Sequence, residues 1–189
     1  ICFVYETQSR KKDAAVICAF NDGYIGDGKF GPTSSEVAGT IKTLNELFCQ
    51  SYAVNQADTK AGVPGVLYGR YDGDHYAGGN PWILLSAALA ELLYRGAADI
   101  QRATQVVAVS GPSASSTSTS PNSNVDADGA LQIDFDLWAQ ALGMDPATAF
   151  TGASAKARAR QLGTALAGAG DGVLTRIRTH VSGAGFHLA

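Results

Sequence analysis

Apolar residues recur every three or four positions between residues 34 and 52, which is the spacing of one face of an α-helix. The positions on this face are Val37, Ile41, Leu44, Leu47, Phe48 and Tyr52. Thr33 and Glu36 have the spacing of a capping box at the start of such a helix. The pattern therefore predicts an amphipathic helix over 34–52. The shorter apolar segment 14–20 fits a helix or a strand, because periodicity alone does not separate the two.

A second apolar stretch, 81–95, carries only one charge, Glu91, before its last residue. Asn80 suits the N-cap of a helix and Pro81 its first position, while Gly96 suits the C-cap. The sequence therefore predicts a helix over 81–95. Because this helix is apolar almost all round, we expect it to be buried on several sides, as an inner helix of a barrel would be.

Two further helices are predicted in the C-terminal half of the chain. Asp134 can cap a short helix over 134–142, which Gly143 would end. A long helix is predicted over 154–181, with its buried side formed by Leu162, Leu166, Val173, Leu174, Ile177 and Val181. Glycines weaken this helix at four positions, Gly163, Gly168, Gly170 and Gly172. We expect a break or a close helix contact near 168–172.

The segments between these helices are predicted to be loops. Residues 21–32 are rich in glycine, and residues 53–68 are polar. Residues 110–124 are a low-complexity run of Ser and Thr that should form an exposed loop. Residues 1–8 are apolar and aromatic, as expected for the tail of a helix. Since no strand-like alternation is present, the predicted fold class is all-α.

Net charge and the lengths of apolar runs argue against nucleic-acid binding and against a membrane span. The chain has 189 residues with a net charge of −3, which gives no electrostatic footprint for nucleic acid. It has no run of 18 apolar residues, so we expect no membrane span. The N-terminal residues 1–5 include no initiator Met, no basic region and no cleavage signal, so we expect a piece from the middle of a longer protein.

No metal site or cofactor is predicted. The cysteines Cys2, Cys18 and Cys49 lack metal-site spacing, and so do the histidines His75, His180 and His187. The cysteines are interpreted as small buried apolar residues, with a single disulfide as the open alternative. The histidines are interpreted as structural or solvated.

The candidate chemistry is concentrated in residues 69–82, which read Gly-Arg-Tyr-Asp-Gly-Asp-His-Tyr-Ala-Gly-Gly-Asn-Pro-Trp. Arginine, aspartate, tyrosine, asparagine and tryptophan side chains are those that hold sugars, through hydroxyl hydrogen bonds and flat apolar faces. The glycines allow sharp turns and a close approach of the backbone to a ligand. The sequence indicates a carbohydrate-binding loop at the start of the helix over 81–95.

This stretch resembles glycoside hydrolase family 15, the glucoamylases. The family pattern is roughly G-R-Y-P-E-D-x-Y-x-x-G-N-P-W, followed by an A-A-A-E-Q-L-Y helix that resembles residues 87–94. A weaker similarity matches 12–14 and 20–22 to a family segment containing D-A-N. The resemblance implies that residues 1–189 are part of one (α/α)6-barrel domain and hold only its later helices, with 110–124 as a loop. The sequence departs from the pattern at Asp72 and Gly73, where the family usually has Pro-Glu.

The resemblance assigns no catalytic residue to this chain. Inverting glycosidases use two carboxyl groups, one as acid and one as base. In the family the acid lies well before the G-R-Y motif, where nothing here matches. The base follows an I-R-x-H run, which resembles residues 177–180, and it would come directly after Ala189.

Two functions remain open. The first is a fragment of a glucan 1,4-α-glucosidase that releases β-glucose from non-reducing ends of α-glucans by inversion. The alternative is a non-catalytic glucoamylase-like domain that acts as a regulatory or structural subunit. The partners implied are an α-glucan or maltooligosaccharide and the remainder of the barrel or neighbouring subunits. A secreted or vacuolar or lysosomal location would follow if the protein is like most eukaryotic glucoamylases.

The resemblance implies five substrate-binding residues: Arg70, Tyr71, Asp74, Tyr76 and Trp82. Arg70 would bind hydroxyls of the terminal glucose; its alternative is a buried ion pair with Asp72 or Asp74. Asp74 would contact the sugar or cap the loop. The aromatic residues would supply apolar faces, although Trp82 could instead pack in the core beneath the loop. Asn80 is interpreted as a helix cap.

Overall fold

The structure is a computed structural model of the chain, which describes residues 12–22, 30–109 and 133–181. Within these ranges all regular secondary structure is helical and no strand is present, which confirms the all-α prediction. The expected loop at 110–124 and the expected helix tail at 1–8 lie outside the described residues. None of the described helices is both long and apolar enough to cross a membrane.

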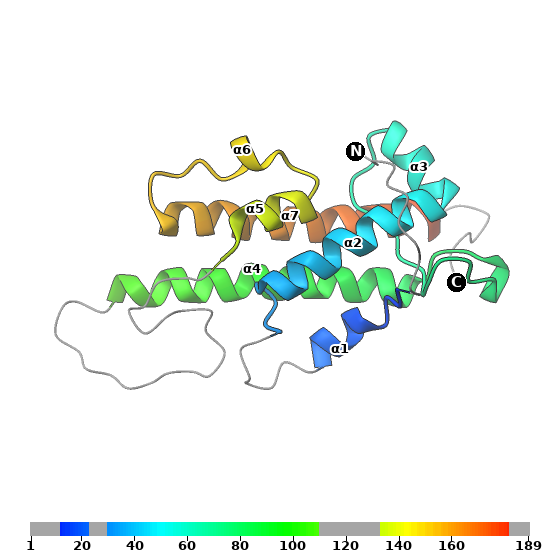
Figure 1. The fold of residues 1–189 in the computed structure, drawn as a ribbon, viewed down its shortest axis with the longest axis horizontal. Helices are drawn as coiled ribbons and strands as arrows, with labels where there is room; N and C mark the ends of the chain where they lie inside the picture. The colour runs from blue at the N-terminus through cyan, green and yellow to red at the C-terminus, as the bar shows by residue number, and fades with distance from the viewer. Residues whose placement is uncertain (1–11, 23–29, 110–132, 182–189) are drawn as a thin grey trace.

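The centre of the fold is a pair of long antiparallel helices, α4 (Ile83–Val109) and α7 (Ala155–Val181), which lie side by side along their length (Figure 1). Small residues let their backbones approach each other. A Cβ added to Gly170 would lie 3.0 Å from the Tyr94 ring, and one added to Gly163 would lie 3.3 Å from Ile100. The predicted close helix contact is therefore present.

Helix α4 is longer than predicted, because Gly96 does not end it. A Cβ at this position would lie 3.2 Å from both the Leu166 side chain and the Pro32 carbonyl oxygen. The glycine therefore serves close packing in the middle of a helix. The start of the helix was also predicted too early, since Asn80 and Pro81 precede the first helical residue.

Helix α7 runs without interruption, so of the two alternatives expected near 168–172 the close helix contact is present and the break is not. Its packing supplies the reason: Gly170 and Gly172 are buried against other elements, which offsets their low helix propensity. The predicted buried side is correct at Leu162, Leu166 and Val173. It is wrong at Leu174, which is 43% exposed.

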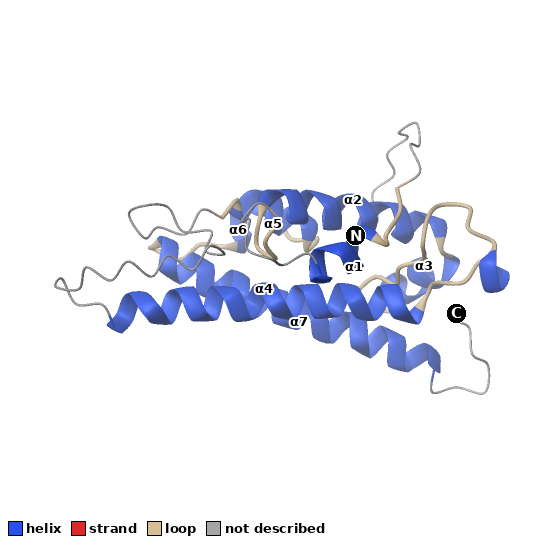
Figure 2. Cartoon of the chain, turned by 90° about the horizontal axis from the view of Figure 1, so that it is seen from below, coloured by secondary structure: helices blue, strands red, loops and turns tan. Residues whose placement is uncertain are grey.

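A second layer of helices covers one side of the α4–α7 pair (Figure 2). Helix α2 (Ser35–Ser51) confirms the helix predicted over 34–52, with Val37, Ile41, Leu44 and Phe48 buried. Its N-cap is Ser34 rather than Thr33, and the Ser34 hydroxyl accepts a hydrogen bond from Val37 N at 3.3 Å. The predicted capping box is therefore not formed. Glu36 accepts a hydrogen bond from the Ser35 hydroxyl instead.

Helix α5 (Phe135–Ala141) packs on α2, and Asp134 caps it as predicted by accepting from Leu137 N at 2.9 Å. Its Trp138 is buried and donates its indole N–H to Thr33 O at 3.0 Å. The short helix α6 (Pro146–Ala149) follows and contacts α5.

Two short helices lie where the sequence predicted no definite helix. One falls in the ambiguous segment 14–20, and the other falls in the predicted loop 53–68. Helix α1 (Val16–Asp22) resolves the segment that fitted a helix or a strand, and it packs on α4. Helix α3 (Ala53–Lys60) lies where a loop was predicted. Its mostly polar sequence gives little helical signal, and its stability comes from buried contacts of Asn55 and Asp58 with distant segments. These helical layers agree with part of an (α/α)6 barrel.

Candidate functional site

The candidate loop, 69–82, lies at one end of the helical layers, where α4 begins and α7 ends (Figure 1). Two backbone hydrogen bonds of 2.7 Å fix its start and its end. Ala14 N donates to Arg70 O, and Trp82 N donates to Tyr68 O. Gly69 is required at the entry, because an added Cβ would lie 1.6 Å from the Tyr52 hydroxyl oxygen. The loop is therefore held by two separate segments, around Ala14 and Tyr52, and the bond from Trp82 to Tyr68 brings its two ends together.

Arg70 lies on the outside of this loop, with its side chain 49% exposed. Its Nε donates to Asp13 Oδ2 at 3.2 Å, and its guanidinium carbon lies 5.7 Å from the centre of the Tyr71 ring. The alternative of a buried ion pair with Asp72 or Asp74 is therefore wrong. Asp72 instead accepts a hydrogen bond from the Ser51 hydroxyl at 2.8 Å.

Asp74 is the buried carboxylate of the loop, 9% exposed. Its Oδ1 accepts a hydrogen bond from Tyr76 N at 3.0 Å, which is the loop-capping contact that the sequence left open. Its Oδ2 is buried and has no hydrogen-bond partner among the described residues. A buried acceptor without a partner is rare in folded proteins and indicates a position that a missing donor would occupy.

Tyr76 and Trp82 form an aromatic pair, with ring centres 5.2 Å apart and an angle of 50° between the planes. Tyr76 is 68% exposed, whereas Trp82 is half-buried against the core. The Trp82 indole N–H is buried and finds no acceptor in the described part of the chain. The pair therefore offers one exposed aromatic face and one unsatisfied buried donor.

Helix α4 begins after Trp82, whose carbonyl oxygen accepts hydrogen bonds from Ser86 N at 3.0 Å and from the Ser86 hydroxyl at 2.9 Å. The predicted N-cap at Asn80 is therefore wrong. The hydrogen bond from Trp82 N to Tyr68 holds this residue in the loop, so the helix starts two residues later than predicted.

Tyr52 lies beneath the loop and is 8% exposed. Burial, together with the nearby charges of Asp74 and Asp72, raises the pKa of its hydroxyl to about 12. The phenol therefore stays neutral at physiological pH. Its ring stacks on Phe48 with centres 5.7 Å apart, which connects the loop to the core of α2.

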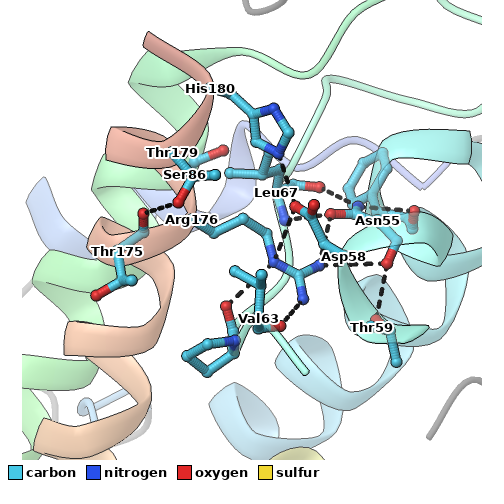
Figure 3. Close-up of polar contacts among 12 residues, drawn as sticks. Asn55, Asp58, Thr59, Val63, Leu67, Ser86, Thr175, Arg176, Thr179 and His180 are labelled. Atoms are coloured by element: carbon cyan, nitrogen blue, oxygen red, sulfur yellow. Dashed lines mark hydrogen bonds and ion pairs between the residues drawn. The ribbon is translucent and has the colours of Figure 1, made fainter. Parts of the chain in front are cut away.

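A buried polar network that the sequence did not predict fixes the chain leading into the loop (Figure 3). Its centre is Arg176 of α7, whose side chain is 1% exposed. The guanidinium reaches across to α3 and the turn after it. It donates to Pro64 O at 3.1 Å, to Asn55 Oδ1 at 3.1 Å and to Val63 O.

The same network contains one carboxylate and one imidazole. Asp58 Oδ2 lies 3.5 Å from Arg176 Nε and 2.7 Å from His180 Nε2. Burial lowers the pKa of Arg176, and the charge of Asp58 acts in the opposite direction. The structural interpretation of His180 agrees with this position. A buried arginine within an otherwise amphipathic helix has no periodic signal, so the pattern along α7 could not reveal it.

The two cysteines in the described residues, Cys18 and Cys49, differ in their bonding state. Cys49 takes part in a disulfide, which is the alternative that the sequence left open, so the interpretation of all three as small buried apolar residues is wrong. Cys18 is a free thiol whose pKa is raised by burial and by the charges of Asp22 and Glu91. Within 12–22, 30–109 and 133–181, no three His, Cys, Asp or Glu side chains gather as metal ligands would.

The chain has relatives among known proteins. Residues 2–121 match the family described as Glycosyl hydrolases family 15. Glucoamylase of Blastobotrys adeninivorans is 33% identical over 103 residues, which are 51% of this chain and 16% of that protein. Glucoamylase P of Amorphotheca resinae is 40% identical over 76 residues, 39% of this chain and 12% of that protein. Glucoamylase 1 of Rhizopus oryzae is 33% identical over 91 residues, 44% of this chain and 14% of that protein.

The match thus spans at most 16% of the length of these relatives. No solved structure matches the chain significantly. The family match, in contrast, begins near the first residue and includes the whole candidate loop and all of α4. Because this match extends over more than half of the 189 residues, the chain belongs to glycosyl hydrolases family 15.

Proposed function

We propose that this chain supplies the sugar-holding part of a glucan 1,4-α-glucosidase, which releases β-glucose from non-reducing ends of α-glucans by inversion. Three relatives that are 33–40% identical to parts of this chain are named glucoamylases. The observation that carries the proposal is Arg70, a half-exposed guanidinium on this loop beside the Tyr71 ring. Such a group can donate two hydrogen bonds to adjacent hydroxyls of a glucose unit.

The other residues of the loop have complementary roles in this proposal. Tyr71 and Tyr76 offer aromatic faces on which the apolar side of a sugar ring can lie. Asp74 Oδ2 could accept a hydrogen bond from a sugar hydroxyl and the Trp82 indole N–H could donate one, but both atoms are fully buried, so the loop would have to shift for a sugar to reach them. The maltooligosaccharide would thereby satisfy two buried polar atoms that the described chain leaves without partners.

The hydrolytic step itself needs a carboxylic acid and a carboxylate on opposite faces of the sugar. Our proposal places both outside the residues of this loop, in other parts of the barrel. A non-catalytic glucoamylase-like subunit would keep the same loop without these groups. Assays of the full-length protein separate the two functions, because only the hydrolase converts maltose into glucose.

Replacing Arg70 by Ala in the full-length protein should weaken maltose binding by about 10- to 150-fold. This is the loss of about 1.5–3 kcal/mol expected for hydrogen bonds from a charged group. Thermal stability should change little, because an exposed ion pair such as Arg70–Asp13 contributes at most about 1 kcal/mol. Isothermal titration and thermal melts of the same variant measure both effects.

Arg160→Ala is the matched control for this experiment. Arg160 is also an exposed arginine, but it lies in the first turns of α7, at the opposite end of the helix from the loop. Its replacement should leave maltose affinity unchanged. An Arg70→Ala variant that binds maltose as tightly as this control would end the assignment of the sugar site.

We also propose that the chain packs against the remainder of its own barrel or against neighbouring subunits. Large apolar side chains are exposed on the α4–α7 pair: Ile83 at 37%, Leu84 at 67% and Leu174 at 43%. Exposed apolar patches of more than a few hundred Å² mark interfaces or aggregation sites. Purified residues 1–189 should therefore self-associate in size-exclusion chromatography with light scattering. A monodisperse monomer that melts cooperatively would contradict this.

A further inference from the structure

Arg70 is held at two points by the segment that starts helix α1. The backbone N–H of Ala14 donates to Arg70 O at 2.7 Å, and Asp13 Oδ2 accepts from Arg70 Nε at 3.2 Å. The two segments are 57 residues apart in sequence. Both the backbone and the side chain of the arginine are therefore oriented by one short stretch of chain.

The Asp13 carboxylate is also held by a hydrogen bond within its own segment. Its Oδ1 accepts a hydrogen bond from Ala15 N at 2.9 Å, which locks the carboxylate at the entry of α1. The next residue, Ala14, and Ile17 one turn later are fully buried. Helix α1 packs on α4, so the carboxylate is presented from a rigid support rather than from a free loop.

The contacts of Arg70 leave one side of its guanidinium available. Nε is bonded to Asp13, and the ring of Tyr71 lies 5.7 Å from the guanidinium carbon. The two terminal nitrogens have no hydrogen-bond partner among the described residues, and the side chain is 49% exposed. These terminal nitrogens carry the pair of parallel N–H donors that can reach two neighbouring hydroxyls at once.

We infer that Asp13 is a positioning residue for sugar recognition, which holds Nε of Arg70 so that the two terminal nitrogens point at the ligand. This inference rests on the proposed function of the loop. Asp13 does not touch the sugar. Asp13 restricts Arg70 to few rotamers before the sugar binds. Less conformational entropy is then lost on binding, and such preorganisation raises affinity.

The experiment measures maltose binding to the full-length protein by isothermal titration, for Asp13→Asn, Arg70→Ala and the double variant. Asn keeps the oxygen that caps Ala15 N but places an amide opposite Arg70 Nε, so the clamp is lost while the helix entry is kept. Asp13→Asn should weaken binding about three- to fivefold, the upper part of what an exposed ion pair contributes. In the Arg70→Ala background the same change should have no further effect.

Asp72→Asn is the control, because this exposed carboxylate lies on the loop but bonds to Ser51 rather than to Arg70. It should leave affinity unchanged. The double-variant comparison supplies the readout that a purely structural role would not move, and nuclear magnetic resonance of the Arg70 Nε–H verifies that Asp13→Asn has removed the bond to Arg70. Exchange of this proton with water should become faster in Asp13→Asn and stay the same in Asp72→Asn.

The results distinguish the positioning role of Asp13 from the proposed sugar site at Arg70. If Arg70→Ala weakens binding but Asp13→Asn does not, the inference about Asp13 is overturned and the sugar site stands. An equal loss from Asp13→Asn with and without Arg70 would also overturn it, because the effect would not act through the arginine. If Arg70→Ala binds maltose normally, the proposed function falls and the inference falls with it.

Discussion

Purified residues 1–189 should release no measurable glucose from maltose or starch. An inverting glycosidase needs two carboxyl groups about 6.5–9.5 Å apart, each free to act on the sugar or on water. Around the loop Asp13 is engaged by Arg70, Asp58 by Arg176 and His180, and Asp72 by Ser51, whereas Asp74 keeps one oxygen without a partner among the described residues. One such carboxylate cannot act as both acid and base. The acid and the base each contribute roughly 10²–10⁴ in rate, so a chain without both should show nothing above background.

A coupled glucose assay on the purified chain tests this expectation. Traces of a host glucosidase are the main source of error, so an Asp74→Asn variant purified in the same way serves as the control. Glucose released by a contaminant would be equal in both samples. Release that is present in the natural chain and disappears with Asp74→Asn would show that the loop itself carries catalysis, contrary to our expectation.

Replacing Arg176 by Met should lower the free energy of unfolding by about 3–5 kcal/mol, the range for removing one partner of a buried ion pair. Asp58, 8% exposed, would lose the cation that is buried beside it. The carbonyl oxygens of Val63 and Pro64 would each lose a donor. Chemical unfolding of the full-length protein, followed by circular dichroism, measures the change.

Arg178→Met is the matched control, because Arg178 lies two residues further along α7 and is exposed. Its replacement should change the free energy of unfolding by less than about 0.5 kcal/mol, as is usual for surface positions. A loss below about 1 kcal/mol for Arg176→Met would mean that the network is not the anchor between α7 and the turn before the loop.

Local sequence determined several helices of this protein. The 34–52 and 134–142 helices were predicted close to their bounds, because their signals lie within a few residues of one another. Ser, Asp and Gly at helix ends act on adjacent backbone groups, and an apolar period of three to four needs only one partner surface. Asp134 illustrates this, since its cap contact spans three residues.

The sequence also determined the family, through the spacing of residues in the 69–82 loop. Such a motif indicates which side chains a function requires, but it does not indicate which contacts orient them. It did not determine their partners. The ion pair considered as the alternative for Arg70 was with Asp72 or Asp74 nearby, but Arg70 meets Asp13, which is 57 residues away.

Tertiary contacts decided the rest, because they reverse local preferences. Gly96 has the residue type of a helix end, yet the close approach of Leu166 and Pro32 makes it a packing position inside α4. Residues 53–60 lack an apolar stripe, yet Asn55 and Asp58 bond to distant segments and hold them as a helix. Arg176 is charged and still buried, since four oxygen-bearing residues surround it only in the folded chain. The free energies of close packing and of buried polar contacts depend on which surfaces meet, and those surfaces meet only in the folded chain.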